Sequence, residues 1–187
     1  MALYTFIAFD MPPEIKTAWW EYAQPLKACY ERVRWVEPEN LHLTLRFLGD
    51  TPANRVDEIA AALQEVAAAS PPFSVTFSGS GVFPNDVRPR VVWIGVNEDG
   101  GALRNLAGAV EACLQRLGFT PEEKRFTPHV TIGYADGTPI PEVMRFLEGN
   151  PFAAMMAQCH EVIFMRSEAH PLGPIYTPLR RLRLDGA

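Results

Sequence analysis

The clearest pattern in the chain is an alternation of apolar and polar residues over positions 41–47. Leucine occupies positions 41, 43 and 45, and His42, Thr44 and Arg46 lie between and after them. Because successive side chains of a β-strand point to opposite faces, this pattern predicts a strand with one apolar face for the core. The other face is expected to carry the imidazole, the hydroxyl and the guanidinium in a row.

The same pattern returns at positions 128–132. His129 and Thr131 fall on one face of this second predicted strand, and Val130 and Ile132 fall on the other. A single His-x-Thr carries little information, since a lone histidine in a strand is usually a satisfied polar residue. Two copies with apolar flanks, in a chain of 187 residues with 4 histidines, indicate that the two histidines share a role.

The rest of the chain interleaves helices and strands without strict alternation. Apolar residues at helical spacing predict helices that begin near Pro12, near Thr51 and after Gly101, and a short helix over 140–148. Thr51 is expected to cap its helix, with Pro52 in the first turn. Further strands are expected at 3–9, 34–36, 73–78, 90–96, 152–158, 160–167 and 175–183. This order argues against a doubly wound parallel sheet.

Composition indicates one globular domain, or two small lobes that share a core. The chain has 187 residues, of which 48% are hydrophobic. Its apolar runs are too short to span a bilayer, and its first residues resemble a strand more than a signal peptide. Cys29, Cys113 and Cys159 are odd in number and lack metal-binding spacing, which favours free thiols in the cytoplasm. The formal charge of −5 argues against non-specific coating of nucleic acid.

The two His-x-Thr strands together predict acid–base chemistry on a phosphate group. Imidazoles titrate near neutral pH, so one can accept a proton while the other donates one. Thr44 and Thr131 add hydroxyl donors, and four donors around a tetrahedral anion describe a phosphate site. Zinc would need three or four ligands, and the spacing of His160, His170 and Cys159 does not supply them. We therefore expect no metal and no cofactor.

The paired motifs His42-Leu43-Thr44-Leu45 and His129-Val130-Thr131-Ile132 resemble those of the two-histidine phosphoesterases. Within that superfamily the chain is most similar to the RNA 2′,3′-cyclic phosphodiesterases, also called 2′-5′ RNA ligases. Supporting stretches lie along most of the chain, at 6–10, 34–36, 81–84, 126–129 and 173–176. The resemblance implies an α+β fold in which residues 1–187 form a single bilobal phosphodiesterase domain. Two pseudo-symmetric lobes with mainly antiparallel sheets are expected to flank a central cleft.

The resemblance also implies an activity, the metal-independent hydrolysis of RNA 2′,3′-cyclic phosphate ends to 2′-phosphomonoesters, together with 2′-5′ RNA ligation as a second activity to test. By analogy, His42 is the proton donor to the departing 3′ oxygen and His129 is the proton acceptor that activates water. Thr44 and Thr131 are expected to hold phosphate oxygens. The expected partner is an RNA 3′ end or a nucleotide that carries the cyclic phosphate, with no membrane involved, and the protein is expected to be a cytoplasmic monomer.

One position departs from the family pattern. Many relatives carry an arginine five residues after the second histidine, where it contacts the phosphate, and this chain has Tyr134 there. Tyrosine donates a hydrogen bond but no charge, so either Arg46 or Arg125 is expected to supply the missing charge. Phe126 and Trp35 are candidates for stacking a terminal base, although aromatic residues are more often part of a core.

Two alternatives stay open at this point. A phosphodiesterase that acts on 2′-5′ oligonucleotides or on small cyclic phosphates would use the same residues. A non-catalytic binder of phosphorylated RNA ends would not require two titrating groups. Turnover of a nucleoside 2′,3′-cyclic phosphate separates the enzymes from the binder.

Overall fold

The computed structural model describes residues 2–98, 100–171 and 173–186. Its strands are β1 (Ala2–Asp10), β2 (Val33–Trp35), β3 (His42–Pro52), β4 (Phe73–Phe83), β5 (Val91–Asn97), β6 (His129–Ala135), β7 (Met155–Cys159), β8 (Glu161–Glu168) and β9 (Ile175–Arg183). Its α-helices are α1 (Pro13–Cys29), α2 (Val56–Ala68), α3 (Ala102–Arg116) and α4 (Pro141–Gly149), with single 3-10 turns at Pro38–Asn40 and Ala53–Arg55.

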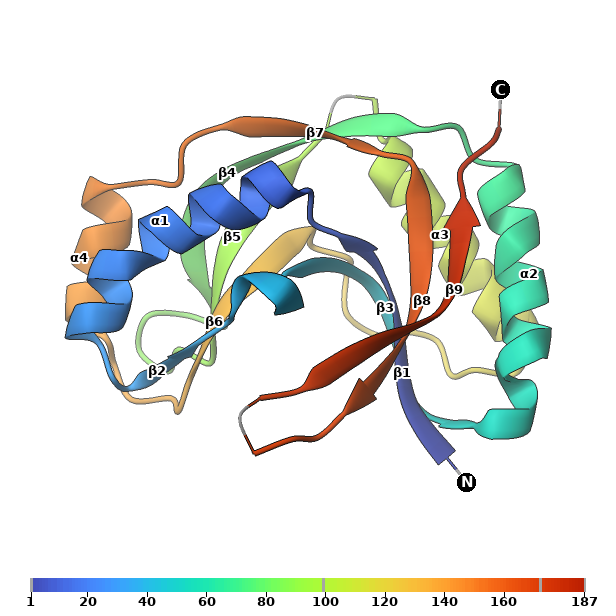
Figure 1. Ribbon diagram of the computed structural model, residues 1–187, viewed down its shortest axis with the longest axis horizontal. Helices are drawn as coiled ribbons and strands as arrows, with labels where there is room; N and C mark the ends of the chain where they lie inside the picture. The colour runs from blue at the N-terminus through green and yellow to red at the C-terminus, as the bar shows by residue number, and fades with distance from the viewer. Residues whose placement is uncertain (1, 99, 172, 187) are drawn as a thin grey trace.

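The strands form one curled sheet in the order β7-β4-β5-β6-β3-β1-β8-β9, with β2 added beside β6. The strand pairs described are antiparallel. Within the described residues, the two halves of the sheet meet through a single pair, Leu43 of β3 and Val130 of β6. Helices α1 and α4 lie with the half that contains β4, β5 and β6, whereas α2 and α3 lie with the other half (Figure 1). The predicted α+β class with mainly antiparallel strands is confirmed, although the strands expected in two separate sheets form the two halves of one sheet.

Most of the core lies between the sheet and the helices. It includes Trp19 of α1, Leu43 of β3 and Leu63 of α2, which are almost fully buried. A smaller apolar cluster, in which Tyr176 packs against Phe6, lies on the opposite face of β1 and β8. Strand β1 is therefore buried on both faces, which holds β3 firmly in place on one side.

The second helix begins later than the sequence predicts. Strand β3 continues through Pro52, and α2 begins at Val56. Thr51 is fully buried, and its hydroxyl shares a 2.7 Å hydrogen bond with the hydroxyl of Thr5 on β1. The predicted cap at Thr51 is wrong because this hydroxyl is used between two strands, where a buried polar group must find a partner.

Among the described residues, no helix has the length and apolar character needed to cross a membrane. Nor do three or more His, Cys, Asp or Glu side chains cluster as they would around a metal ion in that part of the chain. Cys113 and Cys159 are buried free thiols, and burial raises the pKa of Cys159 to about 12. The side chain of Cys29 lies outside the described residues.

Candidate active site

The junction of the two half-sheets places the two His-x-Thr motifs side by side. Leu43 and Val130 are paired in antiparallel register, and both side chains are buried on the helix side of the sheet. Continuing this register by one residue in each direction sets His42 opposite Thr131, and Thr44 opposite His129. The four polar side chains therefore share the other face of the sheet, which we call the histidine face.

Both imidazoles are held in the same way. The Nδ1 atom of His42 lies 2.8 Å from the main-chain oxygen of Asn40, and the Nδ1 atom of His129 lies 2.7 Å from that of Thr127. A carbonyl oxygen can only accept, so each Nδ1 carries a proton and donates it. In each neutral ring Nε2 is then the free basic nitrogen. The structure thus fixes one tautomer in both histidines and leaves both Nε2 atoms available to a substrate.

Aromatic rings pack edge-on against each imidazole. The ring of Tyr176 on β9 lies 5.0 Å from that of His42 at an interplanar angle of 84°, and the ring of Phe6 lies 4.8 Å away in a tilted contact at 39°. The ring of Phe83 on β4 lies 5.0 Å from that of His129 at 81°. Such contacts restrict rotation of the imidazoles, and they repeat in both halves of the sheet.

Burial lowers the pKa of His42 below its usual value. The bond to Asn40 and the charge of Asp10 act in the opposite direction, while His129 and Lys16 contribute further lowering. Asp10, which pairs with His42 across β1 and β3, forms an ion pair with Lys16 at 2.7 Å, so its charge is partly balanced.

A β-bulge turns Arg46 away from the histidine face. Thr44 pairs with Ala8 of β1, but Arg46 pairs with the next residue, Ile7, so Leu45 is an extra residue on β3. A bulge of this kind reverses the alternation of side chains from that point on. The prediction that Arg46 shares a face with His42 and Thr44 is therefore wrong.

An equivalent bulge on β6 brings Tyr134 onto the histidine face. Thr131 pairs with Trp93 of β5, and Gly133 pairs with Val92, so Ile132 is the extra residue. Gly133 then faces the core, where a Cβ atom would lie 2.9 Å from the Trp35 ring. Tyr134 consequently lies on the same face as Thr131, and the interaction of its phenol with Thr131 lowers its pKa, although burial, the larger effect, raises it.

Arg34 is a site residue that the sequence did not single out. On β2 it pairs directly with Tyr134, and its guanidinium lies 4.7 Å from the centre of the Tyr134 ring. Its neighbours Val33 and Trp35 pack toward the core, so Arg34 points to the histidine face. The sequence predicts this strand, at 34–36, but an alternation over three residues does not indicate that Arg34 shares a face with the two motifs.

The family model described as the 2′-5′ RNA ligase superfamily matches residues 12–171. The chain belongs to this superfamily. A superfamily member from Aquifex aeolicus named RNA 2′,3′-cyclic phosphodiesterase is 37% identical over 158 residues, which is 82% of each chain. The predicted family is confirmed.

Solved structures agree over the whole chain. A protein of Thermus thermophilus superposes with a TM-score of 0.83 at 28% identity, covering 100% of this chain and 99% of that chain. E. coli LigT complexed with 3′-AMP superposes with a TM-score of 0.77 at 28% identity, covering 98% and 99%. The superfamily fold is therefore present from end to end of the described residues.

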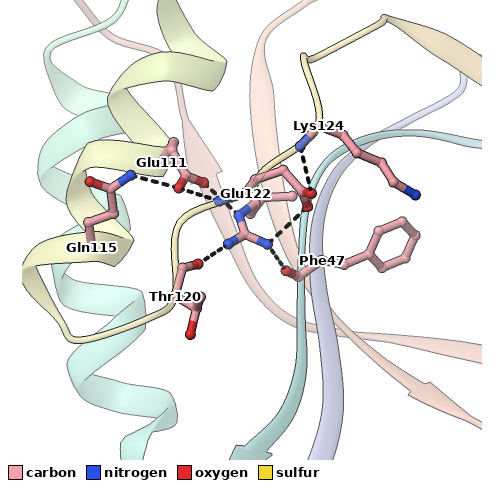
Figure 2. Close-up of polar contacts among 7 residues, drawn as sticks. Phe47, Glu111, Gln115, Thr120, Glu122 and Lys124 are labelled. Atoms are coloured by element: carbon pink, nitrogen blue, oxygen red, sulfur yellow. Dashed lines mark hydrogen bonds and ion pairs between the residues drawn. The ribbon is translucent and has the colours of Figure 1, made fainter.

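In this member of the superfamily, Arg46 is part of a hydrogen-bond network with α3 and the segment that follows it. Its guanidinium donates to Glu111 at 2.6 Å, to the carbonyl oxygen of Thr120 at 2.6 Å and to Glu122 at 3.4 Å. Figure 2 shows these acceptors, and the carbonyl of Phe47, gathered around one guanidinium. The side chain is only 13% exposed. Its donors are occupied within the protein, so Arg46 has a structural role.

We expect Arg46→Ala to destabilise the fold by about 2–3 kcal/mol, since it removes charged hydrogen bonds and leaves Glu111 partly buried without its cation. Burial raises the pKa of Glu111, but its hydrogen bonds, including those from Gln115 and Arg46, outweigh burial and lower it. Because the pKa of Glu111 is lower in the folded protein, the ionised carboxylate stabilises the fold at pH values above its unfolded pKa of about 4.5. This stabilisation is lost as the pH falls through the pKa of the folded protein. Thermal unfolding of wild type and variant at several pH values measures both effects.

The control for this variant is Arg145→Ala, because Arg145 is 70% exposed and its contact to Glu142 is long, at 3.5 Å. It should change stability by less than about 0.5 kcal/mol. A large loss of phosphate affinity in Arg46→Ala with unchanged stability would contradict the structural role.

Two further predicted residues precede β6 in the chain. Arg125 is exposed in the segment before β6, and Phe126 is half-buried and packs against the main core. A cavity of about 550 Å³ lies between α2 and α3, lined by residues such as Val66 and Leu106, and none of the predicted site residues line it. This cavity is therefore separate from the candidate site on the histidine face.

Proposed function

We propose that this protein hydrolyses 2′,3′-cyclic phosphate ends of RNA to 2′-phosphomonoesters by acid–base catalysis with two histidines. The observation that carries the proposal is the register at Leu43 and Val130, which sets His42 opposite Thr131 and Thr44 opposite His129. Membership of the superfamily and the activity named for its Aquifex aeolicus relative support it. RNA ends in the cytoplasm are the proposed substrates, and the proposed active form is a monomer.

In the proposed reaction, Nε2 of His129 accepts a proton from a water molecule, and the oxygen of that water attacks the phosphorus atom. The bond between phosphorus and the 3′ oxygen breaks, and Nε2 of His42 donates a proton to the departing oxygen. The products are a 2′-phosphomonoester and a free 3′ hydroxyl, so atoms and protons balance. The bonds from each Nδ1 to a carbonyl stabilise the imidazolium form that each ring must adopt during the cycle.

Thr44 and Thr131 are proposed to donate hydrogen bonds to the non-bridging phosphate oxygens. Negative charge grows on these oxygens as water attacks, and fixed donors aimed at developing charge are a major source of rate. Because each threonine lies opposite the histidine of the other motif, every proton-transferring group has a phosphate-binding group beside it.

The direct test is turnover of adenosine 2′,3′-cyclic phosphate by the purified protein in excess EDTA. We expect adenosine 2′-monophosphate as the product and an unchanged rate after chelation, since two imidazoles supply both proton transfers. Loss of activity on chelation that zinc or manganese restores would overturn the mechanism. Absence of turnover with both cyclic nucleotides and short RNAs would overturn the function.

A further inference from the structure

Arg34 differs from Arg46 because its donors have no hydrogen-bond acceptor among the described residues. Within that part of the chain, the contact recorded for its guanidinium is with the face of the Tyr134 ring. Arg46, by contrast, is bonded to two carboxylates and two carbonyl oxygens. An exposed guanidinium whose five donors are unused is suited to binding an anion, because its planar fork matches two oxygens of a phosphate.

The position of Arg34 connects both halves of the site. It pairs with Tyr134, whose phenol interacts with Thr131. Its charge also lowers the pKa of Tyr176, although burial, the largest effect, raises that pKa to about 12. The ring of Tyr176 lies 5.0 Å from that of His42. Arg34 is therefore close to side chains that contact a member of each His-x-Thr motif.

A second link holds this arrangement together. The side-chain amide of Asn40 donates a 3.1 Å hydrogen bond to the carbonyl of Pro174, which ties the start of β9 to the residues that precede His42. Asn40 also provides the carbonyl that fixes the His42 ring. Tyr176 is thus positioned by the same segment that orients His42, and it borders the space that Arg34 faces.

We propose that Arg34 binds a non-bridging oxygen of the substrate phosphate beside Thr131, and that Tyr134 holds the guanidinium there by contact with its ring. The inference rests on the proposed function and adds to it the source of positive charge. It replaces the expectation that Arg46 or Arg125 supplies that charge. Arg34 is a substrate-binding residue in this scheme, and Tyr134 is a positioning residue for it.

The test measures binding of adenosine 2′-monophosphate by calorimetry to the wild type and to four variants. Arg34→Ala should weaken binding by about 10- to 100-fold, the usual effect of losing a hydrogen bond between charged groups. Arg34→Lys should recover part of the affinity, because it restores charge without the fork. Tyr134→Leu should weaken binding by a smaller factor, because it frees the guanidinium without removing it.

Arg32→Ala is the matched control, since Arg32 is an exposed arginine two residues away and its loss removes the same charge. It should change affinity by less than about twofold, because surface charges separated from a site are largely screened. Equal losses in Arg34→Ala and Arg32→Ala, or no loss in Arg34→Ala, would overturn the inference. Failure of the proposed function is seen separately, as absence of turnover by the wild type.

Discussion

Alanine in place of His42 or of His129 is expected to reduce hydrolysis of adenosine 2′,3′-cyclic phosphate by at least about 100-fold, within the usual range for loss of a general acid or base. Each variant lacks one of the two proton transfers, while Thr44 and Thr131 still bind the phosphate. Binding of adenosine 2′-monophosphate should therefore fall much less than the rate. Steady-state kinetics together with calorimetry separates the two quantities.

His160→Ala provides the control, because His160 is exposed at the junction of β7 and β8 and belongs to neither His-x-Thr motif. Its rate should match that of the wild type. If either active-site variant kept near-normal turnover while folded, the two-histidine mechanism would be wrong.

The pH dependence of kcat/KM should be bell-shaped, since the productive enzyme carries one proton on the pair of imidazoles. Burial and the neighbouring His129 both lower the pKa of His42. Activity is lost on the acid side when both rings are protonated, so this limb should lie below about pH 6.5, the ordinary histidine value. An acid limb well above that value would contradict the assignment of His42.

Leu43→Ala is expected to have the largest effect on stability together with a loss of activity. Leu43 is fully buried and forms the strand pair that joins the two halves of the sheet. Removing a buried leucine side chain costs about 2–5 kcal/mol through lost burial and the cavity that remains. Because His42 and Thr44 flank this residue, the cavity should also disturb their alignment with Thr131 and His129. We expect at least a tenfold lower rate well below the unfolding temperature.

Leu63→Ala is the control that separates a loss of folding stability from a loss of alignment in the active site. Leu63 is also almost fully buried, but it lies on α2, away from the junction. It should cost a similar free energy of unfolding and leave the rate per folded molecule within about twofold. Equal losses of activity in the two variants would show that the junction has no special role in the site.

The sequence predicted the central strands and the chemistry they carry because those properties are local. Alternation in 41–45 and 128–132 predicts which side chains share a face over a few residues, and both motifs follow it. The last strand, expected at 175–183, is observed at Ile175–Arg183. The family and the α+β class also followed from the motifs. The roles of the two histidines as donor and acceptor, and the single domain over residues 1–187, stay predictions.

Two bulges decided what lies on the histidine face beyond the motifs. A bulge depends on how two strands pair. No residue type in 44–46 indicates one, and on β6 Gly133 is the only local signal. By reversing the alternation, the bulge on β3 turns Arg46 to the core side, and the bulge on β6 turns Tyr134 to the histidine face. Without the bulges, continued alternation would have placed Arg46 on the histidine face and Tyr134 on the core side.

What the sequence determined by itself was the identity of the candidate catalytic groups, two imidazoles and two hydroxyls, and the faces of the strands that present them. What only the tertiary structure decided was their mutual register and which arginine lies beside them on the histidine face. Both depend on contacts between residues far apart in the chain, such as Leu43 with Val130 and Arg34 with Tyr134. Local patterns carry no information about such pairings, because strand order is set by packing of the whole core.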